Sequence, residues 1–250
     1  MSTTPPSTYA ALGPFREYFR GGLPILMYHK LGPRPAGVRL KGLYVGERLF
    51  DRQLAELRQA GYRACDFDAL AGGVPAPSGR IGISFDDGYV NVLRYGLKPL
   101  AEHGFQALQY IVADNIGGGN DWDVAEGEVR EPLMDLAQIR EWLAAGHLIG
   151  SHTLSHAKLP QLSPAQAREE IAASKKKLED LLGVPIVHFC YPYGFWNERV
   201  RDLVIEAGYR TATTTGFGLN DTGTSPFELR RIMARYQSWG LRGLRQRLFG

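Results

Sequence analysis

The feature that most constrains this chain is an alternation of short β-favouring runs with longer amphipathic runs, which extends from about residue 23 to residue 214. The expected strands are residues 24–29, 62–67, 81–85, 105–112, 148–151, 186–191 and 209–214. The expected helices are residues 48–60, 90–103, 136–145, 164–182 and 197–207. Because strands that alternate with helices pair in parallel, and because there are about seven of them, the pattern favours a single-domain α/β barrel over an open sheet.

The clearest helix signals surround residues 164–182. Ser163 and Pro164 place a capping hydroxyl before a proline at the first helical position, and Gly183 follows the last turn. These residues predict both ends of one helix.

Composition supports one globular domain, because 44% of the 250 residues are hydrophobic and 22% are charged. The Pro/Ser/Thr-rich residues 1–22 are expected to form a flexible leader. Residues 23–229 are expected to form the barrel, and residues 230–250 a basic and helical C-terminal segment.

The charges are unevenly distributed, although the formal net charge is only +3. Residues 230–250 carry six arginines and no acid, which leaves the rest of the chain at −3. Trp239, Leu241, Leu244, Leu248 and Phe249 interleave with these arginines. The segment is therefore interpreted either as a helix that contacts an anionic membrane at its surface or as a closing helix packed on the barrel. The small net charge of the whole chain gives no argument for a nucleic-acid partner.

No apolar run in the sequence has the length of a signal peptide or a membrane span. The two cysteines, Cys65 and Cys190, lie far apart in apolar stretches and imply no disulfide framework. The expectation from these features is a cytoplasmic protein, with membrane contact limited to the basic segment.

Two adjacent carboxylates follow the expected strand at residues 81–85. Asp86 and Asp87 precede Gly88, a combination that also occurs in ordinary turns. Neighbouring side chains at a strand end point in different directions, so one carboxylate can bind a cation while the other faces water bound to it. A buried pair of like charges requires such a cation to stay ionised.

His152 and His156 follow another apolar strand, four residues apart. On a helical turn this spacing puts both imidazoles on one face, where they can share a metal ion. Two neutral imidazoles and one carboxylate form a three-ligand site with open positions, which suits Zn²⁺ or another borderline divalent ion.

At these residues the sequence resembles the polysaccharide deacetylase family, the NodB-type carbohydrate esterases. Residues 84–88 (SFDDG) resemble its T/S-F-D-D-G motif, residues 151–156 (SHTLSH) its S-H-T/S-x-x-H motif, and residues 191–194 (YPYG) its third motif, usually R-x-P-Y. The resemblance implies a distorted barrel of seven or eight strands that removes N-acetyl or O-acetyl groups from sugars with one metal ion. That ion is commonly zinc, with cobalt, nickel or iron as alternatives.

Transferred motif by motif, the resemblance makes Asp86 the general base and Asp87, His152 and His156 the metal ligands. Tyr193 would offer its backbone N–H to the oxyanion. Two parts of the family pattern are missing: Cys190 stands where the third-motif arginine is expected, and no late L-x-H motif supplies the usual general acid.

An early histidine provides a substitute for that acid. Residues 25–29 (ILMYH) resemble the M-Y-H strand of the subgroup that includes the poly-N-acetylglucosamine deacetylases, which implies His29 as the general acid. The first and last strands of a closed barrel are neighbours, so the relocation is physically reasonable. The alternative for His29 is a strand-end histidine bonded to a loop carbonyl.

Two further segments are candidates for substrate contact. Residues 116–123 are polar and glycine-rich, and Asn120 and Trp122 are expected to face the sugar there; the alternative is a surface loop anchored by its tryptophan. Phe195 and Trp196 follow the third motif and either line the cleft or pack behind it.

The sequence therefore predicts a metal-dependent hydrolase of an N-acetylated amino sugar, polymeric or linked to a lipid or nucleotide. One alternative is a deacetylase or deformylase of a non-polymeric amide. A second is a catalytically silent sugar-binding barrel, which the cysteine at position 190 favours and the intact Asp86, Asp87, His152 and His156 set argues against.

Overall fold

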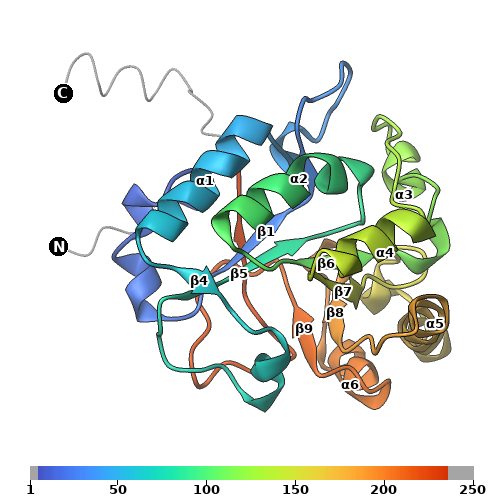
Figure 1. Cartoon of the computed structure of the whole chain (residues 1–250). Coiled ribbons are helices and arrows are strands. Elements are labelled where there is room, and N and C mark those ends of the chain that lie inside the picture. The colour runs from blue at the N-terminus through green and yellow to red at the C-terminus, as the bar shows by residue number, and fades with distance from the viewer. Residues whose placement is uncertain (1–4, 236–250) are drawn as a thin grey trace, which may run out of the picture.

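Eight parallel strands form one curled sheet with helices on its outer side (Figure 1), in a computed structural model that describes residues 5–235. The strand order is β10-β1-β5-β6-β7-β8-β9, and β4 pairs with β5 beside this path. The strands of this sheet are β1 (Ile25–Tyr28), β4 (Arg63–Ala64), β5 (Arg80–Phe85), β6 (Leu108–Ile111), β7 (Leu148–Ser151), β8 (His188–Cys190), β9 (Thr211–Thr213) and β10 (Ile232–Met233). The predicted distorted barrel of seven or eight strands is confirmed.

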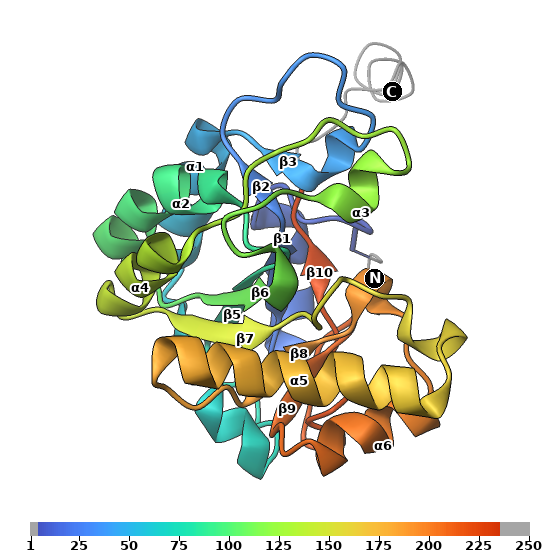
Figure 2. The same ribbon diagram turned by 90° about the vertical axis from the view of Figure 1, so that its right-hand side faces the viewer.

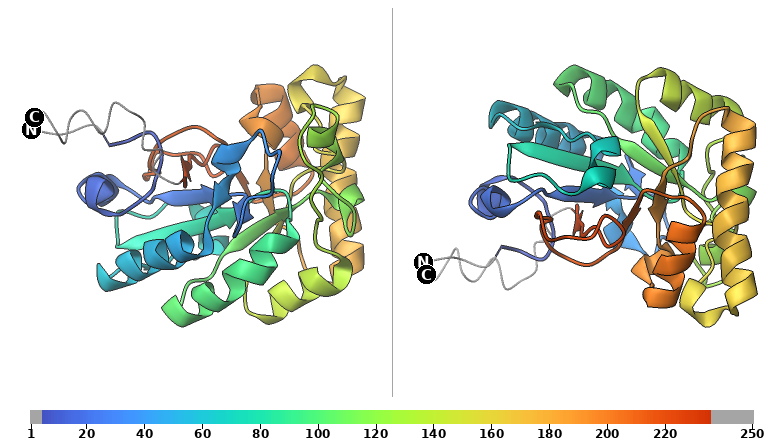
Figure 3. Two further views of the ribbon diagram at one scale, coloured as in Figure 1. Left: turned by 90° about the horizontal axis from the view of Figure 1, so that it is seen from above. Right: turned by 90° about the horizontal axis from the view of Figure 1, so that it is seen from below.

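The barrel curls back on itself where the chain returns from β9 to β10. Leu229 lies beside β9, where its N–H donates to the carbonyl of Ala212 (3.0 Å) and its carbonyl accepts from the N–H of Thr214 (2.9 Å). Three residues later, Ile232 pairs with Leu26 of β1. The first and last parts of the chain are thereby brought to one side of the barrel, as the view from below shows (Figure 3).

Five helices cover the outside of the sheet: α1 (Glu47–Gln59), α2 (Val90–His103), α4 (Leu136–Ala144), α5 (Pro164–Leu182) and α6 (Glu198–Glu206). Each buries an apolar stripe against the strands, such as Phe50, Leu54 and Leu57 of α1. Helix α5 crosses the outside of β7 and β8 (Figure 2). The inner side of the sheet carries a second, smaller apolar cluster that includes Ile25, Phe67, Leu108 and Tyr110. Polar residues such as Asp86, Asp87 and His152 lie at the carboxyl ends of the strands.

Three short elements that the sequence did not predict lie near those strand ends. They are β2 (Lys30–Leu31), β3 (Tyr44–Val45) and α3 (Asp121–Val124). The loop between β2 and β3 runs beside the loop that carries α3 (Figure 2), and the Glu128 carboxylate accepts the backbone N–H groups of Arg39 and Leu40. The two loops therefore support each other.

The expectation of a flexible leader is wrong for residues 5–22. Tyr9, Leu12, Phe15 and Phe19 are all buried, and Tyr9 exchanges backbone hydrogen bonds with the end of β10. Most of these apolar residues lie in or beside two 3-10 helices, Gly13–Phe15 and Tyr18–Gly21, whose short turns leave no α-helical periodicity in the sequence.

The predicted helix at residues 230–250 is also wrong for its first part, and the barrel does not end at residue 229. Ile232 and Met233 form β10, and Arg231 is fully buried in the sheet. Residues 236–250 of that segment, including Trp239, Leu241, Leu244, Leu248 and Phe249, lie outside the described residues. No helix within residues 5–235 has the length and apolar character needed to cross a membrane.

Candidate active site

The two adjacent carboxylates lie where β5 ends, and both are buried. The backbone N–H of Asp86 still bonds to the carbonyl of Tyr28 (3.0 Å), so Asp86 continues the pairing with β1. Asp87 and Gly88 then turn the chain with φ values of 74° and 87°. This turn directs the two side chains to different partners.

Asp87 faces the two histidines of the second motif. Its Oδ1 lies 3.4 Å from Nε2 of His152 and 3.5 Å from Nε2 of His156, with all three side chains buried. One ligand atom of each residue lies within 4.8 Å of the others. The structure thus brings together the three residues that the sequence predicts as ligands.

The donor set suits a borderline divalent cation. Nδ1 of His152 is 2.8 Å from the carbonyl oxygen of Cys190, which can only accept, so Nδ1 is the donor and Nε2, on the side of Asp87, is the atom available to a metal ion. Burial opposes ionisation of Asp87, yet hydrogen bonds from the two histidines hold its pKa well below its usual value. An ionised carboxylate with two imidazole nitrogens fits Zn²⁺ and similar ions.

Asp86 has a different partner, which the sequence analysis missed. Arg231, the residue before β10, places Nη1 2.6 Å from Oδ1 and Nη2 2.8 Å from Oδ2 of Asp86. The same Nη2 lies 3.1 Å from Sγ of Cys190. The cysteine that stands where the family has arginine therefore contacts an arginine supplied from elsewhere in the chain.

This ion pair determines the charge state of Asp86. Burial raises the pKa of a carboxyl group, but the Arg231 and His29 charges more than offset it and hold the pKa of Asp86 below its usual value. Asp86 is consequently ionised at neutral pH and able to accept a proton.

His29 is a second basic neighbour of Asp86. It follows β1, and its Nε2 is 3.8 Å from Oδ2 of Asp86. Its side chain is 15% exposed, whereas that of Asp86 is 4% exposed. The imidazole therefore has the access to solvent that a proton donor to a bound molecule requires.

Unfavourable backbone conformations are concentrated in these motifs. Among the described residues, the non-glycine residues with positive φ are Asp87, Thr153, His156 and Tyr193, and all four lie in the three motifs. Such conformations cost about 1–3 kcal/mol each and persist where surrounding structure enforces them. The strain therefore marks the same residues that the motifs select.

The predicted substrate-side residues are in different environments. The ring of Trp122 stacks on His156, Phe195 is half-exposed beside Tyr193, and Trp196 stacks on Tyr191. Asn120 is fully buried, and its amide bonds to the backbone of Val129 and Glu131. The placement of Asn120 contradicts a direct substrate contact, because its hydrogen bonds are used to hold its own loop.

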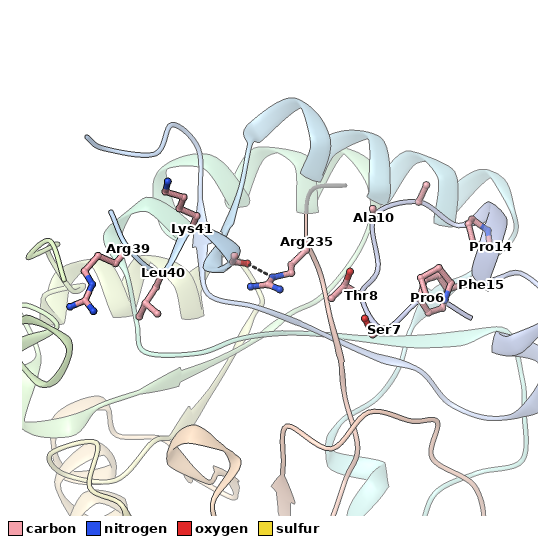
Figure 4. Close-up of a pocket in the computed structure, with 12 residues that line it drawn as sticks. Pro6, Ser7, Thr8, Ala10, Pro14, Phe15, Arg39, Leu40, Lys41 and Arg235 are labelled. Carbon is pink, nitrogen blue, oxygen red and sulfur yellow. Dashed lines mark hydrogen bonds between the residues drawn. The ribbon is translucent and has the colours of Figure 1, made fainter. Parts of the chain in front are cut away.

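Two cavities lie beyond the carboxylates. One of about 410 Å³ is lined by Pro160, Gln161, Gly194, Phe195 and Trp196, next to the third motif. Another, of about 580 Å³, lies between the N-terminal segment and the β2–β3 loop and includes Arg39, Lys41 and Arg235 in its wall (Figure 4). None of the predicted catalytic or ligand residues lines the second cavity.

The curled parallel sheet with this site at its strand ends is the fold of the NodB-like deacetylase barrels. The chain belongs to the polysaccharide deacetylase family, whose sequence model matches residues 73–212. YxkH of Bacillus subtilis, a relative named for the same family, is 26% identical over 84% of this chain and 70% of its own length.

Two solved structures are also similar. BC0361, a polysaccharide deacetylase from Bacillus cereus, has a TM-score of 0.73 and 26% identity, covering 87% of this chain and 66% of that chain. IcaB from Ammonifex degensii has a TM-score of 0.72 and 26% identity, covering 86% of this chain and 92% of that chain. The chain therefore spans about two thirds of two of these three relatives.

Proposed function

We propose that this protein is a metal-dependent hydrolase that removes an acetyl group from an N-acetylated amino sugar. The observation that carries the proposal is that the two adjacent carboxylates have different partners. Asp87 faces two imidazole nitrogens at 3.4 and 3.5 Å, whereas Asp86 is paired with Arg231 outside that cluster. One carboxylate is thus available as a ligand and the other as a base.

Asp87, His152 and His156 would hold the ion. When bound, a divalent ion, zinc first and cobalt, nickel or iron as alternatives, supplies a Lewis acid that polarises the acetyl carbonyl and acidifies water. The Arg231 fork keeps Asp86 ionised and oriented, so that Asp86 accepts the proton of the attacking water.

The remaining steps fall to His29 and Tyr193. His29 donates a proton to the departing amine, which is a poor leaving group without one. Tyr193 has a positive φ, and the centroid of its ring lies 4.5 Å from that of His156, which supports a role for this residue near the ligand cluster. Its N–H is proposed to stabilise the oxyanion.

The substrate is proposed to be an acetylated amino sugar in a polymer of the poly-N-acetylglucosamine type, on the strength of the M-Y-H strand and the cavity beside Phe195 and Trp196. A lipid- or nucleotide-linked sugar and a small non-sugar amide are the alternatives. The silent sugar-binding barrel loses its main support, because Arg231 provides the guanidinium that Cys190 lacks.

The test is to incubate the zinc-loaded protein with polymeric, lipid-linked and free N-acetyl sugars and with simple N-acyl amides. Free amine and acetate are measured by mass spectrometry, with the Asp86→Asn variant as a matched control. We expect acetate and amine in equal amounts from sugar substrates only. Release from simple amides alone would indicate the non-polymeric alternative, and a metal-loaded protein that releases neither product would indicate a binding domain.

We further propose that the basic segment at residues 230–250 brings the protein to an anionic membrane surface. Arg231 is used inside the barrel, so the proposal rests on the sequence of the rest of the segment, in which five arginines alternate with apolar residues and no acid occurs. Flotation with anionic liposomes should depend on residues 239–250, and unchanged flotation after their deletion would contradict the proposal.

A further inference from the structure

The two candidate histidine ligands are supported in different ways. A metal-binding histidine usually donates its second ring N–H to an acceptor, which fixes the ring orientation. His152 follows this rule through its 2.8 Å contact with the Cys190 carbonyl. His156 is only 7% exposed, and its Nδ1 is buried without a hydrogen-bond partner among the described residues. Something other than a hydrogen bond must therefore fix this ring.

Aromatic rings surround the His156 imidazole instead. The ring of Trp122 lies nearly parallel to it, with centroids 4.5 Å apart and planes at 21°. Tyr193 contacts it edge-on at 4.5 Å and 69°. A stacked indole restricts rotation of the imidazole about its Cβ–Cγ bond, because rotation would drive the edge of the imidazole into the face of the indole.

Trp122 is itself held by a well-bonded loop. Oδ1 of Asn120 accepts the N–H of Glu131 (2.7 Å), and the Glu131 carboxylate lies 2.9 Å from Nζ of the fully buried Lys30. Lys30 follows His29 and is the first residue of β2. These contacts fix the loop to the barrel beside the candidate catalytic residues. Trp122 therefore has a fixed position, and the His156 ring packs against it.

We propose that Trp122 is a positioning residue for His156: its indole, rather than a hydrogen bond, sets the imidazole plane that directs Nε2 at Oδ1 of Asp87. The inference rests on the proposed role of His156 as a metal ligand. An imidazole bound to a cation carries partial positive charge, and the electron-rich face of an indole favours it in that state. Trp122 therefore strengthens metal binding even though it is not a ligand.

This role differs from sugar stacking in what a substitution changes. A residue that orients a ligand affects metal affinity in the absence of substrate. A residue that only stacks on a sugar affects KM and leaves metal affinity unchanged. The measured quantity is therefore the dissociation constant of Zn²⁺, obtained by competition with a chromogenic chelator and without substrate.

The informative variants are Trp122→Leu, which removes the π face, and Trp122→Phe, which retains one. We expect zinc affinity to fall about 10-fold in Trp122→Leu, the lower end of losses for residues that orient a metal ligand, and by less than about 3-fold in Trp122→Phe. The d–d spectrum of the Co²⁺ form should change in the leucine variant only. Trp196→Leu removes an indole that stacks on Tyr191 at 6.0 Å, and it should leave zinc affinity unchanged.

Melting temperatures identify any variant that fails to fold; in that case Trp122→Met, which keeps apolar volume without a ring, replaces Trp122→Leu. Wild-type zinc affinity in the leucine or methionine variant would overturn the inference, and a raised KM in the same variant would assign the indole to the sugar. A wild-type protein that binds no metal would instead overturn the proposed function, so the two failures are distinguishable.

Discussion

The Arg231 guanidinium donates two parallel hydrogen bonds to the Asp86 carboxylate, although the two residues are 145 positions apart in the sequence. All the guanidinium donors have partners: Nε bonds to the carbonyl of Thr214, and the outer contacts go to Ser84 and Cys190. Such a bidentate pair fixes direction as well as charge. The base of the proposed reaction is thus oriented by the strand that closes the barrel.

Replacing Arg231 should therefore impair turnover more than metal binding. We expect Arg231→Lys to keep the zinc content of the wild type and to lower kcat about 10- to 100-fold, because lysine preserves the charge but not the fork. Arg231→Ala leaves a buried carboxylate without its cation and should also destabilise the fold by about 3–5 kcal/mol. Acetate release, zinc content and urea unfolding measure the three effects.

The contact between Nη2 of Arg231 and Sγ of Cys190, at 3.1 Å, suggests a rescue. The double variant Cys190→Arg, Arg231→Ala moves the guanidinium to the third-motif position, where the family usually carries it. Part of the activity lost in Arg231→Ala should return. If the double variant folds, binds zinc and is no more active than Arg231→Ala, the guanidinium position matters beyond its contact with Asp86.

Substitutions of Asp86 and of His152 should separate catalysis from metal binding. Asp86→Asn keeps the ligand cluster intact and should retain zinc while losing about 10²- to 10⁴-fold in turnover. His152→Ala removes a ligand, and we expect it to lose both zinc and activity. Zinc content by mass spectrometry and acetate release decide between these outcomes. Zinc loss in Asp86→Asn, or full activity in His152→Ala, would contradict the assignment.

Local signals in the sequence predicted most of the fold and the core of the site. Helix α5 runs over the predicted residues because Ser163 and Gln166 form a capping box and Gly183 ends it at φ 70°. The candidate residues Asp86, Asp87, His152 and His156 could be selected because each motif is short and lies at a strand end. These features depend on residues close together in sequence, which is where pattern reasoning works best.

The errors involve contacts that local sequence patterns do not reveal. Arg231 lies in an arginine-rich segment that resembles a solvated surface, and only the tertiary fold places it 2.6 Å from Asp86. Strand β10 is two residues long, too short for an alternating pattern. Asn120 sits in a polar loop, and nothing in the sequence indicates that its amide is used within that loop. The absence of arginine at position 190 was the one signal that justified a search for another guanidinium.

The proposed role of His29 predicts a dependence on the leaving group. A sugar amine must be protonated to depart, whereas 4-nitrophenolate leaves as an anion. We expect His29→Gln to lower hydrolysis of an N-acetyl sugar about 10²-fold or more and that of 4-nitrophenyl acetate less than about 3-fold. Steady-state rates on both substrates at equal zinc loading measure this. An equal loss on amide and ester would mean that His29 acts on Asp86 rather than on the leaving group.

His147 provides a test of stability that does not involve the proposed active site. It is buried, its ring packs on Trp142 at 4.4 Å, and its Nδ1 accepts the backbone N–H of Ala107 (3.3 Å). Burial lowers the pKa of His147 to about 4, whereas an unfolded histidine titrates near pH 6.5. Between these values the unfolded chain binds a proton that the folded chain does not.

The fold should therefore be fully stabilised by neutral His147 above about pH 6.5 and lose that contribution, at most about 3 kcal/mol, as the pH falls towards 4. In His147→Asn the amide oxygen can still accept the Ala107 N–H, but the side chain does not titrate. We expect the variant to be less stable than the wild type at pH 7.5, because the ring contact with Trp142 is lost, and the difference to shrink at pH 4.5. All other residues are the same in both proteins, so the difference in the free energy of unfolding, measured by urea titration without metal, isolates His147. A difference that is the same at both pH values would mean that folding does not shift the pKa of His147.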